Sequence, residues 1–522
     1  MKNTAYKILL FNAAILISLL TACKETKTEQ PFTQLPHRTP ESQGVGTESI
    51  LRFLEATEEE NLEMHSFMYV RHGNVITEAW WEPYKSNINH LMYSVSKTFT
   101  STAIGFAVDE KLLTVDDKVI SFFPEDLPEE ISPYLKELSV KNLLTMSVGH
   151  ETPPVFHITD DNWARRFLAT PIVNEPGSVF SYSSYASYML SAIIQKVTGQ
   201  STFEYLKPRL FEPLGMTDIQ WETDMQGISY GGGGMRIKTS DMAKLGQLYL
   251  QEGVWNGKQL LSAAWIKEAS SAQIYQVQNP TEEQKLIDEG AQGYGYQIWR
   301  CTHNAYRADG ANGQYILVMP DQDAVIAVTS QVKNMRRILQ LVWQHLLPGM
   351  FDHSLRRNED LDEFLISRLN SLSIPNPFFT DEDKITPLKN TSRKFTFDTN
   401  EQNIEEMSFV FDEVGDCKLT VKIAGTAYDY PFGLDAWRYG STERPGPYFL
   451  NPRRNPAGLS PFTVSGYYSW TNPDELKLHL LYITESQYET YVCKFKDEQI
   501  SIEISNSMQS DEKPVSITGQ LQ

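Results

Sequence analysis

The sequence predicts a two-domain protein: an α+β domain in which helices flank an antiparallel sheet, followed by a separate all-β domain. In the first 350 residues, strand patterns lie at both ends and a mostly helical region of about 95–290 lies between them. After about residue 392 the pattern changes to short alternating strands. With 522 residues, 41% of them hydrophobic, the chain has enough apolar material for more than one core.

The sheet of the first domain should begin with a hairpin, because strand-like runs at 66–70 and 75–80 flank Arg71-His72-Gly73-Asn74. Helices near the N-terminal end and at 335–346 should cover one face of this sheet, and the helical region should cover the other. The strands expected to complete the sheet lie near 293–300, 304–309, 313–319 and 323–330.

The C-terminal domain reads as a β-rich barrel or sandwich of about 130 residues. A last helix at 361–372 and a linker precede it, and its expected strands are 394–397, 408–411, 419–423, 476–480, 488–495 and 500–504. Its two cysteines, Cys417 and Cys493, could form a disulfide or remain as two buried thiols. The predicted boundaries are 37–350 for the first domain, 351–391 for helix and linker, and 392–522 for the β-rich domain.

The N-terminus predicts export. A basic start and an apolar stretch from Ile8 to Leu20 are followed by Leu20-Thr21-Ala22-Cys23, which is typical of a secretory signal. It resembles a bacterial lipoprotein signal, in which residues 1–22 are removed and Cys23 is lipidated, leaving 23–36 as a tether. We therefore expect a protein anchored by lipid in the bacterial cell envelope, on the periplasmic face or the cell surface.

Composition excludes several kinds of partner. With 46 basic and 66 acidic residues, the net charge of −20 argues against binding to nucleic acid. The ten histidines are scattered without metal-ligand spacing, so we expect neither a metal nor a cofactor. The sequence does not indicate an oligomeric state.

The most informative motif is Ser94-Val95-Ser96-Lys97. In a helix that begins near Ser94, the Lys97 amine lies one turn away and can reach the Ser94 hydroxyl. The following residues are small or apolar as far as Val108, which indicates a buried helix. Burial lowers the pKa of a lysine, and a neutral amine can take a proton from serine.

Five further motifs follow Ser94-Val95-Ser96-Lys97 in order. They are Leu143-Leu144-Thr145-Met146, Pro176-Gly177 before Tyr182-Ser183-Ser184, Phe211-Glu212-Pro213-Leu214-Gly215-Met216, Gly231-Gly232-Gly233-Gly234-Met235 before Thr239-Ser240-Asp241-Met242, and Gly310 to Tyr315. With these motifs in this order, the chain resembles the serine β-lactamase and penicillin-binding-protein family over roughly residues 40–350. The resemblance is nearest the class C β-lactamase branch, close to its esterases and 6-aminohexanoate-oligomer hydrolases.

The resemblance implies a β-lactamase-like fold and an acyl-enzyme mechanism. Ser94 is then the nucleophile, activated by Lys97, and the N–H groups of Ser94 and Ala311 form the oxyanion hole. Tyr182 matches the family's Tyr-x-Asn tyrosine, whose phenol could serve as general base if a nearby ammonium lowers its pKa. Either Lys97 or Tyr182 could take the proton.

Three positions expected to contact substrate are Ser184, Asp309 and Gly310. Ser184 stands where the family usually has asparagine, so a donating amide is replaced by a shorter hydroxyl. Ala308-Asp309-Gly310 stands where Lys-Thr-Gly or His-x-Gly is usual, so the cation that binds a carboxylate is absent, and Gly310 retains the close backbone approach. Asp309 could face the cleft, where it would repel an anionic substrate or pair with a cationic one, or it could be exposed to solvent.

The sequence therefore predicts an envelope-anchored serine hydrolase acting on a small or peptide-like ester or amide, with doubtful β-lactamase activity. Two alternatives stay open. One is processing of D-alanyl peptides or β-lactams; the other is a non-catalytic penicillin-binding-type sensor or binder that retains the fold.

Overall fold

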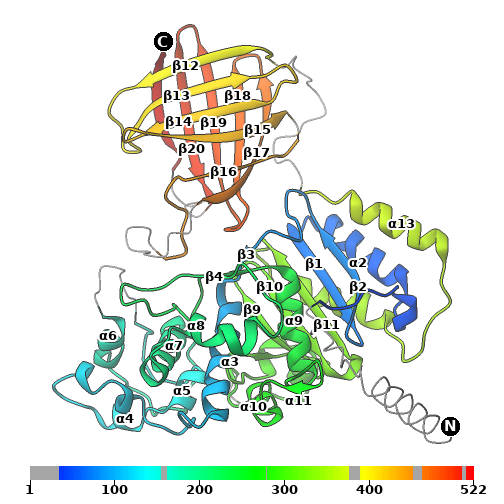
Figure 1. Cartoon of the computed structure of the whole chain (residues 1–522), viewed down its shortest axis with the longest axis vertical. Coiled ribbons are helices and arrows are strands. Elements are labelled where there is room, and N and C mark those ends of the chain that lie inside the picture. The colour runs from blue at the N-terminus through cyan, green and yellow to red at the C-terminus, as the bar shows by residue number, and fades with distance from the viewer. Residues whose placement is uncertain are drawn as a thin grey trace, which may run out of the picture.

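The computed structural model describes residues 34–154, 162–277, 279–374, 388–434, 436–450, 461–507 and 513–522. Cys23 and the predicted signal lie outside the described residues. The N-terminal α+β part and the C-terminal all-β part are distinct bodies in Figure 1. The predicted fold class, a β-lactamase-like domain followed by an all-β domain, is confirmed.

A six-stranded antiparallel sheet forms the centre of the first domain, in the order β2-β1-β11-β10-β9-β8. Three of its inner strands, β1, β11 and β10, are buried at every residue because both faces of the sheet are covered. The strands are β1 (Met64–Arg71), β2 (Asn74–Trp80), β8 (Trp299–Arg300), β9 (Tyr306–Gly310), β10 (Gln314–Met319) and β11 (Ala324–Ser330). The expected strand at 293–300 is mostly irregular, and only Trp299–Arg300 joins the sheet.

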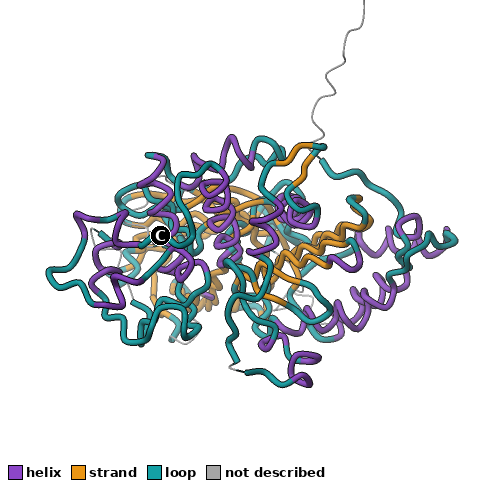
Figure 2. Tube along the Cα trace, turned by 90° about the horizontal axis from the view of Figure 1, so that it is seen from below, coloured by secondary structure: helices purple, strands orange, loops and turns teal. Residues whose placement is uncertain are grey.

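Alternate residues of each strand enter two different cores. Phe67 and Tyr69 pack against α2 (Thr47–Glu59), α12 (Arg336–Leu341) and the π-helical turn Val342–Leu346. Met68 and Val70 belong to the larger core on the opposite face, which the helical region completes. In Figure 2 the strands lie in the middle of the view with helices on both sides.

The helical region and the remaining helices have the following bounds: α3 (Ser96–Asp109), α4 (Pro133–Glu137), α5 (Val140–Leu144), α6 (Trp163–Ala169), α7 (Ser184–Thr198), α8 (Thr202–Leu206), α9 (Thr239–Leu250), α10 (Ala263–Ala269), α11 (Glu282–Ile287) and α13 (Glu359–Asn370). Helix α9 packs on β1, β10 and β11, and α3 packs on α7. Two small sheets complete this domain: β3 (His90–Leu91), β5 (Met235–Ile237) and β4 (Gln220–Trp221), and the hairpin β6 (Val254–Trp255) and β7 (Lys258–Gln259).

The C-terminal domain is a closed antiparallel sheet around a third core, and of the two predicted forms it is the barrel. The sheet closes where β15 pairs with β17 in parallel. The strands are β12 (Thr391–Phe397), β13 (Ile404–Phe411), β14 (Cys417–Ile423), β15 (Thr426–Leu434), β16 (Arg438–Thr442), β17 (Phe462–Asn472), β18 (Glu475–Tyr482), β19 (Gln487–Lys496), β20 (Gln499–Asn506) and β21 (Val515–Leu521).

Four of these strands, β15, β16, β17 and β21, were not expected from the sequence. Cys417 and Cys493 are both buried free thiols, so the disulfide alternative is not realised. A search of the described helices finds none whose length and apolar character would suit a membrane span.

The barrel contacts the first domain through the turn between β18 and β19. The Leu91 N–H of β3 donates to the Thr484 carbonyl of that turn, at 2.7 Å. Next to it, Ser486 hydrogen-bonds to His90, which in turn hydrogen-bonds to His65 of β1. These contacts place the barrel turn directly behind the strand that leads to Ser94.

Candidate functional site

Ser94 lies in a 3-10 turn, Tyr93–Val95, that runs directly into α3. Tyr93 has a φ of +45°, which is uncommon for a bulky residue and is maintained only where the surroundings hold the backbone. The Ser96 hydroxyl holds part of this turn by donating to the Tyr93 carbonyl at 2.7 Å. The helix starts two residues later than Ser94, but Ser94 and Lys97 still lie one turn apart, as the spacing predicts.

Lys97 is buried at the start of α3 and points at the Ser94 hydroxyl. The distance from Lys97 Nζ to Ser94 Oγ is 2.9 Å, and the same nitrogen lies 3.0 Å from Ser184 Oγ and donates to the Gly232 carbonyl. Burial lowers the pKa of Lys97 to about 7. A neutral amine has a lone pair, so at neutral pH Lys97 can accept the proton of Ser94.

Tyr182 joins the same group from the loop before α7. Its hydroxyl hydrogen-bonds to Ser94, its ring stacks on Trp299 with centroids 5.8 Å apart, and Lys97 Nζ lies 5.0 Å from the ring centroid. Burial raises the pKa of Tyr182 well above 10, and the charge of Asp309 adds to the rise. The expected lowering of this pKa by an ammonium is not found, because burial is the largest influence on Tyr182 and raises its pKa. The phenol is therefore a neutral proton donor.

Ser184 is the first residue of α7 rather than a loop residue, because Ser183 caps the helix by accepting from the Ala186 N–H. Its hydroxyl accepts from Lys97 at 3.0 Å and also hydrogen-bonds to Tyr230. The Ser184 hydroxyl is therefore already engaged within the site, where it orients the Lys97 amine.

Gly310 ends β9 beside the strand that leads to Ser94. A Cβ atom at this position would lie 2.5 Å from the Met92 carbonyl oxygen, so only glycine permits the approach. Ala311 follows in an exposed turn. Among the turn and loop hydrogen bonds of the described residues, none is donated by the N–H groups of Ser94 and Ala311, which suits both groups to binding an oxyanion.

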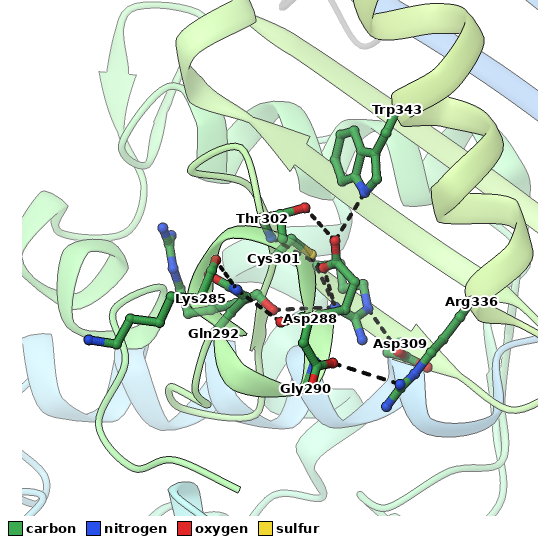
Figure 3. A network of polar contacts seen from close by, with 12 residues as sticks. Lys285, Asp288, Gly290, Gln292, Cys301, Thr302, Asp309, Arg336 and Trp343 are labelled. Atoms are coloured by element: carbon green, nitrogen blue, oxygen red, sulfur yellow. Dashed lines mark hydrogen bonds and ion pairs between the residues drawn. The ribbon is translucent and has the colours of Figure 1, made fainter. Parts of the chain in front are cut away.

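Asp309 is mostly buried and is paired within the protein. Its carboxylate accepts from Arg307 Nε at 2.8 Å, and Arg307 also donates to the Arg300 carbonyl and lies 3.7 Å from Glu289. Figure 3 shows Asp309 as part of this network, which continues through Thr302 and Trp343. Full solvent exposure of Asp309 is therefore wrong, because residues two apart on a strand share a face and Arg307 pairs with the carboxylate; a direct contact between Asp309 and a ligand stays a prediction.

Two contributors to the site were not predicted, the Gly232 carbonyl and Tyr230, and the ring of Phe449 packs beside Tyr230. The glycine run Gly231 to Gly234 could have pointed to the Gly232 carbonyl, since a Cβ atom at Gly232 would lie 2.5 Å from the Ser184 carbonyl oxygen. Phe449 belongs to the C-terminal domain, and no local pattern points to it.

Cavity size does not identify this site. A cavity of about 790 Å³ lies instead between the two domains, lined by residues that include Glu63, Trp81, Trp437 and His479. The convergence of Ser94, Lys97, Tyr182 and Ser184 is what singles out the first site. Among the described residues, no group of three or more His, Cys, Asp or Glu side chains is placed to hold a metal ion.

Comparison with known proteins agrees with this geometry. The family model described as Beta-lactamase matches residues 55–340. The 6-aminohexanoate-dimer hydrolase of Paenarthrobacter ureafaciens is 24% identical over 51% of this chain and 72% of its own length. Penicillin-binding protein 4 of Amycolatopsis lactamdurans is 26% identical over 45% of this chain and 70% of its own length.

Among solved structures, a penicillin-binding protein homologue from Pyrococcus abyssi has 18% identity and a TM-score of 0.46, and the match covers 90% of this chain and 99% of that one. The family model matches more than half of the chain, and it does so over the segment that contains Ser94, Lys97 and Tyr182. The chain therefore belongs to the beta-lactamase family of serine hydrolases.

Proposed function

We propose that this protein cleaves an ester or amide bond through an acyl-enzyme on Ser94. The observation that carries the proposal is the 2.9 Å contact between Ser94 Oγ and the Nζ atom of a buried lysine whose pKa lies near 7. A solvated lysine would be almost fully protonated at neutral pH and could not serve as a base. A protein that only binds its ligand has no need of such a pair.

The reaction begins when Ser94 Oγ attacks the substrate carbonyl carbon and its proton passes to Lys97 Nζ. Negative charge then develops on the carbonyl oxygen, where the N–H groups of Ser94 and Ala311 stabilise it. The bond to the leaving group breaks as that group takes a proton, from the Lys97 ammonium directly or through the Tyr182 hydroxyl. In the second half, water attacks the acyl carbon with Lys97 again as base, the bond from that carbon to Ser94 Oγ breaks, and Ser94 takes the proton back from Lys97.

The charges around the site favour a substrate without a carboxylate near the scissile bond. Ala308 occupies the position at which the family usually has a cation. Arg307 does not replace it, because its guanidinium pairs with Asp309 and contacts the Cys301 sulfur. A penicillin or a C-terminal D-alanine would lack the family's usual cation at this position, so we propose a neutral ester or amide as the substrate class.

Labelling of the purified protein tests this proposal. A fluorescent phosphonate should label the protein, fluorescent penicillin should not, and Ser94→Ala should abolish labelling. Label by both reagents would favour D-alanyl or β-lactam processing, and label by neither would favour a non-catalytic binder. A screen of short-chain esters, D-amino-acid peptides and linear amide oligomers then identifies the leaving group.

We also propose attachment to the cell envelope through lipid on Cys23. Its support is the sequence alone: the basic start, the apolar stretch and the small residues before Cys23. In a bacterial host, the full-length protein should fractionate with membranes and Cys23→Ser should not. Equal membrane fractions of both proteins would contradict the anchor.

A further inference from the structure

We propose that Phe449, contributed by the C-terminal domain, forms an apolar wall of the Ser94 site and selects substrates that carry a ring-sized apolar group. This inference rests on the proposed hydrolase activity. Phe449 lies in the strap (residues 443–450), which follows β16 and leaves the barrel toward the first domain.

The ring of Phe449 contacts the immediate neighbours of three site residues. It packs edge-on against Tyr93, which precedes Ser94, with ring centroids 5.6 Å apart. It lies 5.8 Å from the ring of Tyr230, whose hydroxyl bonds to Ser184. A Cβ atom at Gly233 would lie 2.5 Å from the Phe449 ring, so glycine at this position makes room for it.

Two backbone N–H groups of the strap hold it against the first domain. The N–H groups of Phe449 and Leu450 donate to the two carboxylate oxygens of Glu222, at 3.1 and 2.6 Å. Glu222 is fully buried, and on its other side it accepts from Arg236 at 2.6 Å. A buried carboxylate is stable only when it is paired and hydrogen-bonded, so these N–H groups are part of what stabilises it.

The same arginine ties the strap to the barrel. Arg236 makes a two-bond contact with Glu485, in the turn between β18 and β19, at 2.5 Å for each bond. The side chains of Arg236, Glu222 and Glu485 have no exposed surface. Two carboxylates and one guanidinium leave one negative charge, which the two strap N–H groups and the geometry of the pair offset. The barrel and the strap are therefore positioned together against the first domain.

The surface that results is aromatic. Phe449 is partly exposed, and its ring packs on Tyr93 and Tyr230. Tyr182 and its stacking partner Trp299 add a second aromatic pair to the same site. Aromatic rings bind flat apolar groups through offset or edge contacts. A phenyl or similar group attached close to the scissile bond would gain this contact, and an acetyl or ethyl group would not.

Steady-state kinetics of the full-length protein test the inference in two arms. The first compares p-nitrophenyl phenylacetate with p-nitrophenyl acetate, and the second compares benzyl acetate with ethyl acetate. Phe449→Ala should lower the ratio of kcat/KM values, ring over small group, about tenfold in at least one arm. Phe449→Tyr should keep most of that ratio, because it preserves the aromatic ring.

The matched control is Phe364→Ala, on α13, whose side chain is 58% exposed and whose helix packs on α2 and β2. This variant should keep the wild-type ratios. Ratios for Phe449→Ala that equal those of the control in both arms, or that rise, would overturn the inference. Failure of the proposed function is distinguishable, because wild-type protein would then take no phosphonate label on Ser94 and no ester would be cleaved.

Discussion

Acylation of Ser94 should depend on pH through Lys97. The amine must be neutral to accept a proton, and its pKa of about 7 follows from burial. The rate should therefore be low at acid pH, rise through pH 7 and become constant above about pH 8. A solvated lysine would instead make the rate rise up to pH 10 and beyond.

The size of the effect follows from the same pKa. Roughly 10% of Lys97 is neutral at pH 6 and roughly 90% at pH 8, so the acylation rate should fall about tenfold between pH 8 and pH 6. Lys97→Arg keeps a side chain of similar length that stays protonated throughout this range. Its acylation at pH 8 should be about 10²–10⁴ times slower than that of wild type, the usual contribution of a general base, and should not show the change between pH 6 and pH 8.

The assay is the second-order rate of phosphonate labelling, which reports acylation-type attack without a deacylation step. Lys238→Arg serves as the matched control, since Lys238 pairs with Asp218 at the surface and should leave rate and profile unchanged. A flat rate from pH 6 to pH 8, or a Lys97→Arg variant that labels as fast as wild type, would refute the assignment of Lys97 as the base.

Three further outcomes follow from the structure. Tyr182→Phe removes a hydroxyl beside Ser94 that can relay a proton to the leaving group, and should lower kcat for ester hydrolysis about 100-fold with little change in melting temperature; a kcat within twofold of wild type would remove Tyr182 from the mechanism. Gly310→Ala should push β9 away from the Met92 carbonyl and cost about 10²–10³ in kcat through displacement of the Ala311 N–H, and an active variant would contradict that role. Arg236→Met leaves two buried carboxylates unpaired and should lower the free energy of unfolding by about 3–5 kcal/mol in denaturant titrations; a loss below about 1 kcal/mol would mean that the pairs contribute little.

Much of the first domain could be predicted because its signals are local. Alternating residues such as Phe67 and Met68 enter opposite cores, and helix periodicity places Lys97 one turn from Ser94. The strands that were missed lack such signals. Strand β17 is buried at nearly every position and so does not alternate, and β15 contains Pro431 and Gly433, which are unusual inside strands.

The parts of the site that could not be predicted depend on tertiary contacts. Asp309 forms an ion pair with Arg307, which weakens any effect of the Asp309 charge on a ligand. This pairing depends on both side chains lying on the same face of β9, which only the folded structure shows. Burial raises the pKa of Tyr182 and the interaction with Ser94 lowers it, so the result depends on the folded surroundings of the phenol. Phe449 reaches the site across more than 200 residues of sequence, through a carboxylate that no motif marks.

The most direct test of the account is to identify the residue that carries the covalent group. Full-length protein is treated with a phosphonate, digested and analysed by tandem mass spectrometry. We predict a single adduct on Ser94, present in wild type at pH 8 and absent from Ser94→Ala. An adduct on any other residue, or an unmodified Ser94 in protein that hydrolyses esters, would contradict the assignment of Ser94 as the nucleophile.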